Sequence, residues 1–287
     1  MNFKVESDST LLQFLLESMG DRSRSAVKSY LTHGQVSVNG CRTTRYDMPL
    51  TAGDTVTVSQ NRIAPLLRHP MLRIVYEDRR IIVVDKRNGL LSVGTDKEQK
   101  KTGFYILSEH IKRTDRGARL FVVHRLDRET SGLMIYAKDT TTQEILQRNW
   151  HDMILDRRYV AVIEGQLPAN EGTIRTKLHE DRNRKVWACR EGDGKDASTR
   201  YKVLSSGNGY SLVELSLETG RKNQIRAHME WMKTPIAGDR KYNARTNPAG
   251  RVCLHAYKLC FIHPETGERL DFSTGIPRAF TDIVSAP

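Results

Sequence analysis

The chain has 287 residues, of which 38% are hydrophobic, so it is long enough for one large and one small domain with buried cores. Lysine and arginine number 46 against 34 acidic residues, and the net charge of +12 favours a polyanionic partner, because each neutralised phosphate releases counterions. The chain shows no basic amphipathic helix and no apolar run of spanning length, so nucleic acid is favoured over a membrane. Charge alone also fits a basic protein whose surface serves only solubility.

The four cysteines, Cys41, Cys189, Cys253 and Cys260, are scattered and include no Cys-x-x-Cys pair. The apolar segment 11–16 is too short for a secretory signal and lacks a basic start. We therefore expect a reduced, cytoplasmic protein without disulfides or structural zinc.

The first 60 residues predict a small α+β domain. Four segments have the pattern of two helices followed by two strands: 11–19, 23–34, 35–38 and 55–58. Ser9 or Thr10 can cap the first helix and Ser23 the second, and Asn39-Gly40 is typical of a hairpin turn.

This layout, with Ser23-Arg24-Ser25-x-Val27-Lys28 and Gly34-x-Val36-x-Val38-Asn39-Gly40, resembles the RNA-binding module named after ribosomal small-subunit protein four. The resemblance implies that Arg22, Arg24 and Lys28 contact RNA. Six basic and six acidic residues cancel within residues 1–60, so the whole excess of +12 lies beyond residue 60. The three cations could instead form an ordinary solvated helix face.

The segment that follows predicts a linker and then the start of a larger domain. Residues 61–70 contain two prolines and little periodicity, which indicates a linker. Two strands, at 75–78 and 81–86, are expected next, closed by Asn88-Gly89. Two helices are predicted further on, one over 105–112 with Thr102 as its cap and one from Asp139 to Trp150.

Residues 122–136 predict a strand, a charged loop and a second strand, with Gly132 allowing the turn. In the loop, Asp127 lies between Arg125 and Arg128. Opposite charge within a few ångströms lowers the pKa of a carboxyl group, so we expect Asp127 to stay ionised and to be a candidate nucleophile. The alternative is a surface ion cluster that caps a hairpin.

Two later segments contain further candidate residues. Alternation along 157–165 predicts a strand that turns Tyr159, Ala161 and Ile163 to one face, where a tyrosine is more often part of the core. Asn223 can cap a helix in which Arg226 lies four residues before Glu230, the spacing of an exposed ion pair.

His124-Arg125-Leu126-Asp127-x-x-Thr130-Ser131-Gly132-Leu133 resembles the active-site signature of the RluA-type pseudouridine synthases. Three further stretches resemble other motifs of that family: 76–90, 157–165 and 220–226. Arg87 stands where the family usually has proline, and Asn223 where histidine is commoner. Pro235-Ile236-x-Gly238-Asp239-x-x-Tyr242 completes the resemblance.

The resemblance implies an α+β fold, with a large catalytic domain at 71–287 on a mainly antiparallel mixed β-sheet with flanking helices, joined through 61–70 to the small domain at 1–60. It implies isomerisation of uridine in RNA, with no cofactor, because the reaction involves no net redox change. Ribosomal RNA is favoured over transfer RNA, and a monomer is expected.

The same resemblance assigns roles to single residues. Asp127 is the nucleophile or, on another route, a base at the ribose 2′ position. Tyr159 stacks on the base and accepts its proton, and Arg226 forms an ion pair with Asp127. Arg125 fills the gap that the flipped uridine leaves. Arg221 and Lys222 are further candidate RNA contacts.

Two other functions compete with this one. A non-catalytic RNA-binding or ribosome-assembly factor could keep the same fold, although intact Asp127, Tyr159 and Arg226 argue against it. A glycoside hydrolase could pair Asp127 with Glu129, but no aromatic sugar platform is evident. His255 and His263 show no metal-ligand spacing and are expected to be structural or surface groups.

Overall fold

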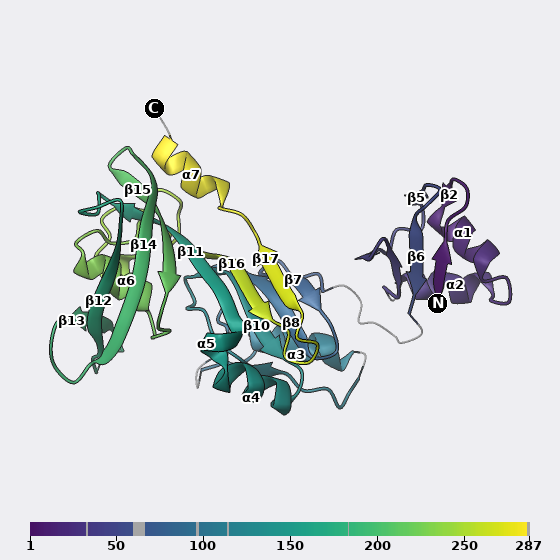
Figure 1. Cartoon of the computed structure of the whole chain (residues 1–287), viewed down its shortest axis with the longest axis horizontal. Coiled ribbons are helices and arrows are strands. Elements are labelled where there is room, and N and C mark those ends of the chain that lie inside the picture. The colour runs from purple at the N-terminus through teal and green to yellow at the C-terminus, as the bar shows by residue number, and fades with distance from the viewer. Residues whose placement is uncertain (33, 60–66, 96–97, 114, 183, 286–287) are drawn as a thin grey trace. The chain divides into compact units, whose positions relative to one another are not determined.

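The computed structural model describes residues 1–287 except 33, 60–66, 96–97, 114, 183 and 286–287, and it contains two compact units (Figure 1). One unit consists of Met1–Arg68 with Leu107–Arg119, and the other of His69–Ile106 with Leu120–Pro287. Most of the predicted linker lies outside the described residues. No helix in the described part of the chain is long and apolar enough to cross a membrane.

The N-terminal unit contains the two predicted helices, α1 (Leu11–Ser18) and α2 (Arg24–Thr32). They share one core with a four-stranded sheet. Its strands, in spatial order, are β1 (Asn2–Lys4), β6 (Thr55–Val58), β3 (Val36–Val38) and β4 (Cys41–Arg42). A further pair joins β2 (Ser9–Thr10) to β5 (Pro49–Leu50). The predicted helices and the strands at 35–38 and 55–58 are confirmed, whereas β1, β2, β4 and β5 are too short and irregular in pattern to be predicted.

The two predicted helix caps of this unit have different outcomes. Ser23 Oγ accepts a hydrogen bond from Ala26 N (3.2 Å), so this cap is confirmed. Thr10 precedes α1 but makes no capping bond with its side chain, so that prediction is wrong. The first amides of α1 donate to backbone carbonyls instead, Leu11 N to Met48 O (2.9 Å) and Leu12 N to Tyr46 O (3.0 Å), which makes a side-chain cap unnecessary.

The second unit is built on a mixed sheet that has eleven strands in the described part of the chain. Strand β10 runs parallel to β16, and the other registered pairs are antiparallel, as predicted. The main path in spatial order is β13 (Val186–Cys189), β12 (Glu171–Glu180), β14 (Lys195–Gly207), β15 (Tyr210–Leu217), β11 (Ile154–Glu164), β16 (Leu254–Ile262), β10 (Ser131–Ala137), β8 (Ile81–Lys86) and β7 (Leu72–Glu77). Strand β17 (Arg269–Ser273) pairs with β16, and β9 (Phe121–Val122) pairs with β10.

Helices cover parts of this sheet (Figure 1). Their bounds are α4 (Thr140–Arg148), α5 (Trp150–Met153), α6 (Gln224–Trp231) and α7 (Arg278–Ser285), with a 3-10 turn η1 at Arg240–Tyr242. Helix α3 (Gly103–Lys112) begins in this unit, but from Leu107 onward it belongs to the unit of Met1–Arg68. Helix α6 packs against β12, β13 and β14, while α4 contacts β9 and β10 and α5 contacts β11. Asp139 caps α4 by accepting from Thr142 N (2.8 Å), and Thr102 caps α3 by accepting from Tyr105 N (3.1 Å), as predicted. The single helix expected up to residue 150 is divided into α4 and α5.

The predicted hairpin of residues 122–136 is present as β9 and β10. Gly132 does not form its turn, however, but lies inside β10 with φ 116°. A Cβ atom at this position would lie 2.2 Å from Ala256 O of β16, so only glycine allows the two strands to meet. Gly132 thereby lets the loop 123–130 lie beside the centre of the sheet.

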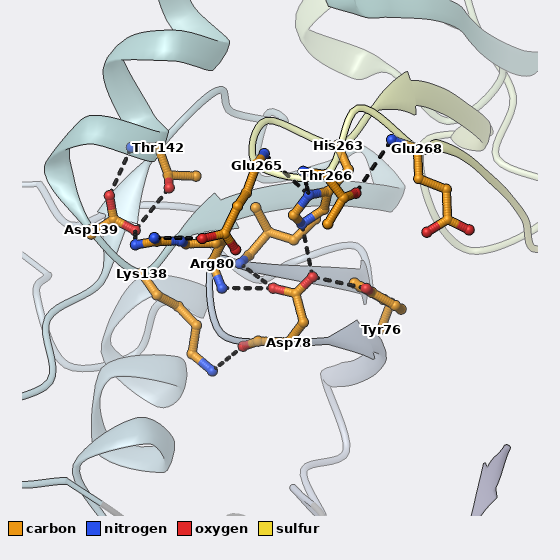
Figure 2. A network of polar contacts seen from close by, with 11 residues as sticks. Tyr76, Asp78, Arg80, Lys138, Asp139, Thr142, His263, Glu265, Thr266 and Glu268 are labelled. Carbon is orange, nitrogen blue, oxygen red and sulfur yellow. Dashed lines mark hydrogen bonds and ion pairs between the residues drawn. The ribbon is translucent and has the colours of Figure 1, made fainter.

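A polar network ties three turns of this unit together (Figure 2). Asp78, between β7 and β8, accepts hydrogen bonds from Arg80 N (2.7 Å), Ile81 N (2.8 Å), Tyr76 Oη (2.8 Å) and His263 Nε2 (2.9 Å). Arg80 contacts Glu265 (2.6 Å) and the capping Asp139 (3.4 Å). His263 is therefore a structural residue, as expected, and so is His255, which is buried between Ser131 (2.8 Å) and Thr274 (2.8 Å).

Candidate active site

The loop 123–130 is anchored through its backbone to the segment that follows β8. Ser92 Oγ donates to Leu126 O (2.6 Å) and accepts from Leu126 N (3.1 Å), while Thr130 N donates to Asp127 O (3.2 Å). These bonds fix the loop on both sides of the Asp127 side chain, which is 20% exposed. Hydrogen bonds to the backbone thus tie down the residues next to Asp127.

Arg226 is almost completely buried, with 7% of its side chain exposed, and its closest partner is Asp239. Its Nε and Nη2 atoms donate to the two Asp239 oxygens at 2.6 and 2.7 Å. Nη1 lies 3.8 Å from Asp127 Oδ2, so the expected ion pair with Asp127 exists but is the longer of the two. The prediction of an exposed ion pair between Arg226 and Glu230 is wrong, because Arg226 is buried and Glu230 binds Lys185 (2.8 Å).

The amide of Asn223 is the nearest hydrogen-bond donor to Asp127. With its nitrogen toward the carboxylate it donates to Oδ1 (3.0 Å) and Oδ2 (2.7 Å), and its oxygen then accepts from Tyr242 Oη (3.0 Å). The opposite orientation would point an oxygen at the carboxylate. Asn223 precedes α6 in the left-handed conformation (φ 51°) and makes no capping bond, so the predicted cap is wrong and the side chain supports Asp127 instead.

Tyr159 extends from β11 into the same cavity and is 5% exposed. The cavity has a volume of about 70 Å³ and is lined by Asp127, Tyr159, Arg226, Asn223 and their neighbours. Burial raises the pKa of the Tyr159 hydroxyl, so the phenol is neutral at physiological pH. Three residues widely spaced in the sequence are thus brought together, as the resemblance implied.

The pKa of the Asp127 carboxyl group shifts in the direction opposite to the one expected from the sequence. Burial raises the pKa of its carboxyl group above the ordinary 3.8, although the positive charges of Arg226, Arg125 and Lys86 oppose the rise. Arg128 does not take part, because it donates to Glu98 (2.5 Å) and to Gly89 O (3.2 Å). The predicted lowering of the Asp127 pKa fails for two reasons. Of the two arginines that flank Asp127 in the sequence, only Arg125 acts on the carboxylate, and burial removes water from the carboxyl group.

Lys86 is a buried amine whose charge acts on Asp127, and it was assigned no role from the sequence. Its Nζ donates to Leu90 O (2.9 Å) and Arg87 O (3.1 Å), and burial lowers the pKa of the ammonium to about 7. The neighbouring Arg87, which replaces the usual proline, donates its backbone N–H to Met71 O (2.9 Å). Proline could not make that bond.

Two grooves share lining residues with the cavity. The basic groove, about 670 Å³, is lined by cations that include Arg128, Arg184, Lys222, Arg240, Lys241 and Arg251. The Trp150 groove, about 640 Å³, is lined by residues that include Trp150, His151, Arg157, Arg158 and Arg200. Arg125 is exposed and lines both grooves and the cavity. This placement suits contact with a strand that crosses the cavity.

The remaining predicted RNA contacts fall into two sets. Arg221 lines the cavity and donates to Asp196 O (3.2 Å), and Lys222 lines the basic groove, where it forms an ion pair with Glu180. Arg22, Arg24 and Lys28 belong to the N-terminal unit and are exposed. Arg22 lies 3.5 Å from Asp21. A role in RNA binding stays a prediction for all of these residues.

Several members of the site gave only weak signals in the sequence. Asp239 and Tyr242 belong to a stretch that matched the family, but their partners Arg226 and Asn223 became evident only in three dimensions. Among the residues that the structure describes, no three His, Cys, Asp or Glu side chains are grouped as metal ligands. The arrangement is a half-buried carboxylate beside a neutral phenol, next to a groove lined by cations, a combination that suits a reaction on a polyanion.

Comparisons with known proteins agree with this class. Residues 80–231 match the family model described as RNA pseudouridylate synthase. The chain is 34% identical to the uncharacterized RNA pseudouridine synthase YlyB of Bacillus subtilis, over 95% of this chain and 92% of that protein. It is 36% identical to ribosomal large subunit pseudouridine synthase D of Neisseria meningitidis serogroup B, over 94% and 76%. The structure of human RNA pseudouridylate synthase domain containing 4 aligns with a TM-score of 0.60 and 25% identity, covering 72% of this chain and 90% of that one.

The chain therefore belongs to the RNA pseudouridylate synthase family. It is an RNA pseudouridine synthase, an isomerase, so the predicted family, fold class and enzyme class are confirmed. The family match begins at residue 80, so the resemblance of the N-terminal domain to an RNA-binding module stays a prediction.

Proposed function

We propose that this enzyme isomerises specific uridines in structured RNA, with large-subunit ribosomal RNA as its substrate and Asp127 as the reacting carboxylate. The observation that supports the site assignment most strongly is the common cavity of Asp127, Tyr159 and Arg226. The choice of ribosomal RNA is supported by the 36% identity to a relative named for the large ribosomal subunit. Exposed Arg24 and Lys28, one turn apart on α2, would add affinity from the N-terminal unit.

The reaction breaks the N-glycosidic bond, rotates the uracil and rejoins it to the sugar through carbon. Asp127 either attacks the nucleotide or removes the ribose 2′ proton, and both routes start from the ionised carboxylate. Asn223 favours the ionised form by donating hydrogen bonds to both carboxylate oxygens. Arg226 adds positive charge, and Asp239 fixes the plane of the Arg226 guanidinium. The site thus keeps a partly dehydrated carboxylate oriented toward the cavity.

Tyr159 and Arg125 would act on the base and on the helix it leaves. The ring of Tyr159 would stack on the uracil, and its hydroxyl, which stays neutral because burial raises its pKa, would relay a proton. A paired uridine must leave its helix to enter the cavity, which costs a few kcal/mol. Arg125, exposed at the junction of the cavity and both grooves, is placed to fill the vacated position.

Mapping pseudouridines in a strain that lacks the gene tests this function. Missing sites should lie in large-subunit ribosomal RNA and should return when the strain carries the wild-type gene, but not when it carries Asp127→Asn. Missing sites in transfer RNA would contradict the substrate, and restoration by Asp127→Asn would contradict the site. A strain with every site intact would favour a non-catalytic ribosome-assembly role.

A further inference from the structure

Arg157 is a cation of the active site to which no role has been assigned above. It lies on β11 two residues before Tyr159, so both side chains leave the same face of the strand and line the cavity of Asp127. The guanidinium carbon is 5.4 Å from the ring centroid of Trp150 and 6.0 Å from that of Tyr159. Two aromatic rings therefore hold the guanidinium in place.

Arg157, like Arg125 but unlike the other two arginines that line the Trp150 groove, has no ion-pair partner in the described part of the chain. Arg158 contacts Asp156 (2.9 Å) and Glu214 (3.3 Å), and Arg200 contacts Glu218 (2.5 Å). The backbone of Arg157 pairs with β16, but its guanidinium makes no hydrogen bond or ion pair with any residue that the structure describes. Its guanidinium donors are consequently available to a ligand.

The position of Arg157 indicates which ligand group it meets. It lines both the cavity and the Trp150 groove, so it stands where a nucleotide chain would pass from one into the other. The groove, at about 640 Å³, lies in the size range of small-molecule sites and can hold a nucleotide. At that junction an RNA strand presents a phosphate, and a planar guanidinium binds phosphate through two parallel hydrogen bonds.

We propose that Arg157 binds the phosphate that joins the target uridine to its neighbour, and that the Trp150 groove takes this neighbouring nucleotide. The inference rests on the proposed function, because it places the target uridine beside Asp127. Since the rings of Trp150 and Tyr159 already restrict the guanidinium, little conformational entropy is lost when the phosphate binds. Arg157 would in this way set the position of the sugar relative to Asp127.

The first test measures binding of a short oligouridylate at several salt concentrations. Arg157→Gln should weaken binding about tenfold and lower the slope of log affinity against log salt by about 0.7, the value for one phosphate contact with a single strand. Arg278→Gln, on α7, is the matched control: its side chain is 93% exposed, it lines neither groove nor the cavity, and the slope should not change. An equal slope for wild type and Arg157→Gln would overturn the proposal.

The second test neutralises single phosphates in an RNA that the wild-type enzyme converts. One methylphosphonate linkage, on either the 5′ or the 3′ side of the target uridine, should slow wild-type single-turnover isomerisation about tenfold. In the Arg157→Gln enzyme, the methylphosphonate that slows the wild type should have no further effect on the rate. A methylphosphonate on the other side of the uridine should slow the wild-type and Arg157→Gln enzymes by the same factor. Independent, additive losses at both linkages would refute the contact.

Two further measurements separate the possible failures. Arg157→Lys keeps the positive charge but loses the planar guanidinium, so it should show the wild-type salt slope but a lower isomerisation rate. Thermal unfolding shows whether each variant is folded. A wild-type enzyme that converts no uridine would refute the proposed function. The salt slope would still report on Arg157 in that case.

Discussion

Two carboxylates of the catalytic unit, Asp78 and Asp127, have similar exposure, 25% and 20% of their side chains, but opposite surroundings. Asp78 accepts hydrogen bonds from two backbone amides, a phenol and an imidazole (Figure 2). The imidazole of His263 donates from Nε2, because its Nδ1 accepts from Glu265 N (3.2 Å) and Thr266 N (3.0 Å). The acceptor positions of Asp78 are thus occupied by the protein itself.

Asp127 has fewer donors and lies against a cavity. Its hydrogen bonds come from the Asn223 amide, and the Arg226 guanidinium is 3.8 Å away. Burial leaves its pKa raised, which means that the folded protein bears a cost for keeping this carboxylate charged. A carboxylate whose acceptors are saturated holds turns together, whereas one that is dehydrated and incompletely paired is available for reaction.

The largest difference should appear when each carboxylate loses its charge. Asp127→Asn should lower the rate of uridine isomerisation by at least about 10³-fold, because the reacting group is gone. RNA affinity should change less than about twofold, since phosphate contacts dominate affinity. Single-turnover conversion and an RNA-binding titration measure the two quantities. Retained conversion by Asp127→Asn would mean that another residue reacts.

Asp239→Asn should reveal how much the buried pair behind Asp127 contributes to stability. It leaves the Arg226 guanidinium buried without its bidentate partner, so the free energy of unfolding should fall by about 3 kcal/mol. Glu218→Gln, which removes the partner of the exposed Arg200, is the control and should cost less than about 1 kcal/mol. Urea denaturation compares them, and equal losses would show that burial of the pair is unimportant.

Asp78→Asn should affect folding but not chemistry. The amide cannot accept all the hydrogen bonds that Asp78 receives, so the free energy of unfolding should fall by about 2 kcal/mol. The rate constant of the folded enzyme should stay within about twofold of wild type. If the rate fell sharply while the protein remained folded, the network of Figure 2 would have to support the active site directly.

The smallest effect concerns pH. Activity needs ionised Asp127, so kcat/KM should fall as the pH drops through its pKa, which burial has already raised. Asn223→Gly removes two hydrogen bonds to the ionised form and fits the left-handed backbone, so the acid limb should move upward by about one pH unit or less.

A matched variant controls for the backbone change in that experiment. Asn243→Gly alters another left-handed asparagine (φ 65°), whose amide binds Glu230 (2.5 Å) instead of Asp127. Its pH profile should equal that of wild type. A shift of the same size in both variants would show that the backbone, and not the Asn223 amide, is responsible.

Local features of the sequence predicted much of the fold. The Ser23, Thr102 and Asp139 caps, the hairpin of β9 and β10, and the strand that contains Tyr159 depend on nearby residues and on alternation, so they could be inferred without knowing the distant neighbours. The cap at Thr10 failed for the opposite reason, because carbonyls of Met48 and Tyr46 satisfied the helix amides. Backbone carbonyls from distant residues cannot be predicted from the sequence next to the helix.

The sequence by itself determined the enzyme class, since the motif around Asp127 and those around Tyr159 and Arg226 match the family in order. Only the tertiary structure decided that Arg226 is held by Asp239, that Asn223 supports Asp127 rather than a helix end, and that the pKa of Asp127 rises. The physical reason is that the hydrogen bonds, ion pairs and loss of water that a side chain experiences depend on all the residues packed around it. Those neighbours come from strands and helices far apart in the chain.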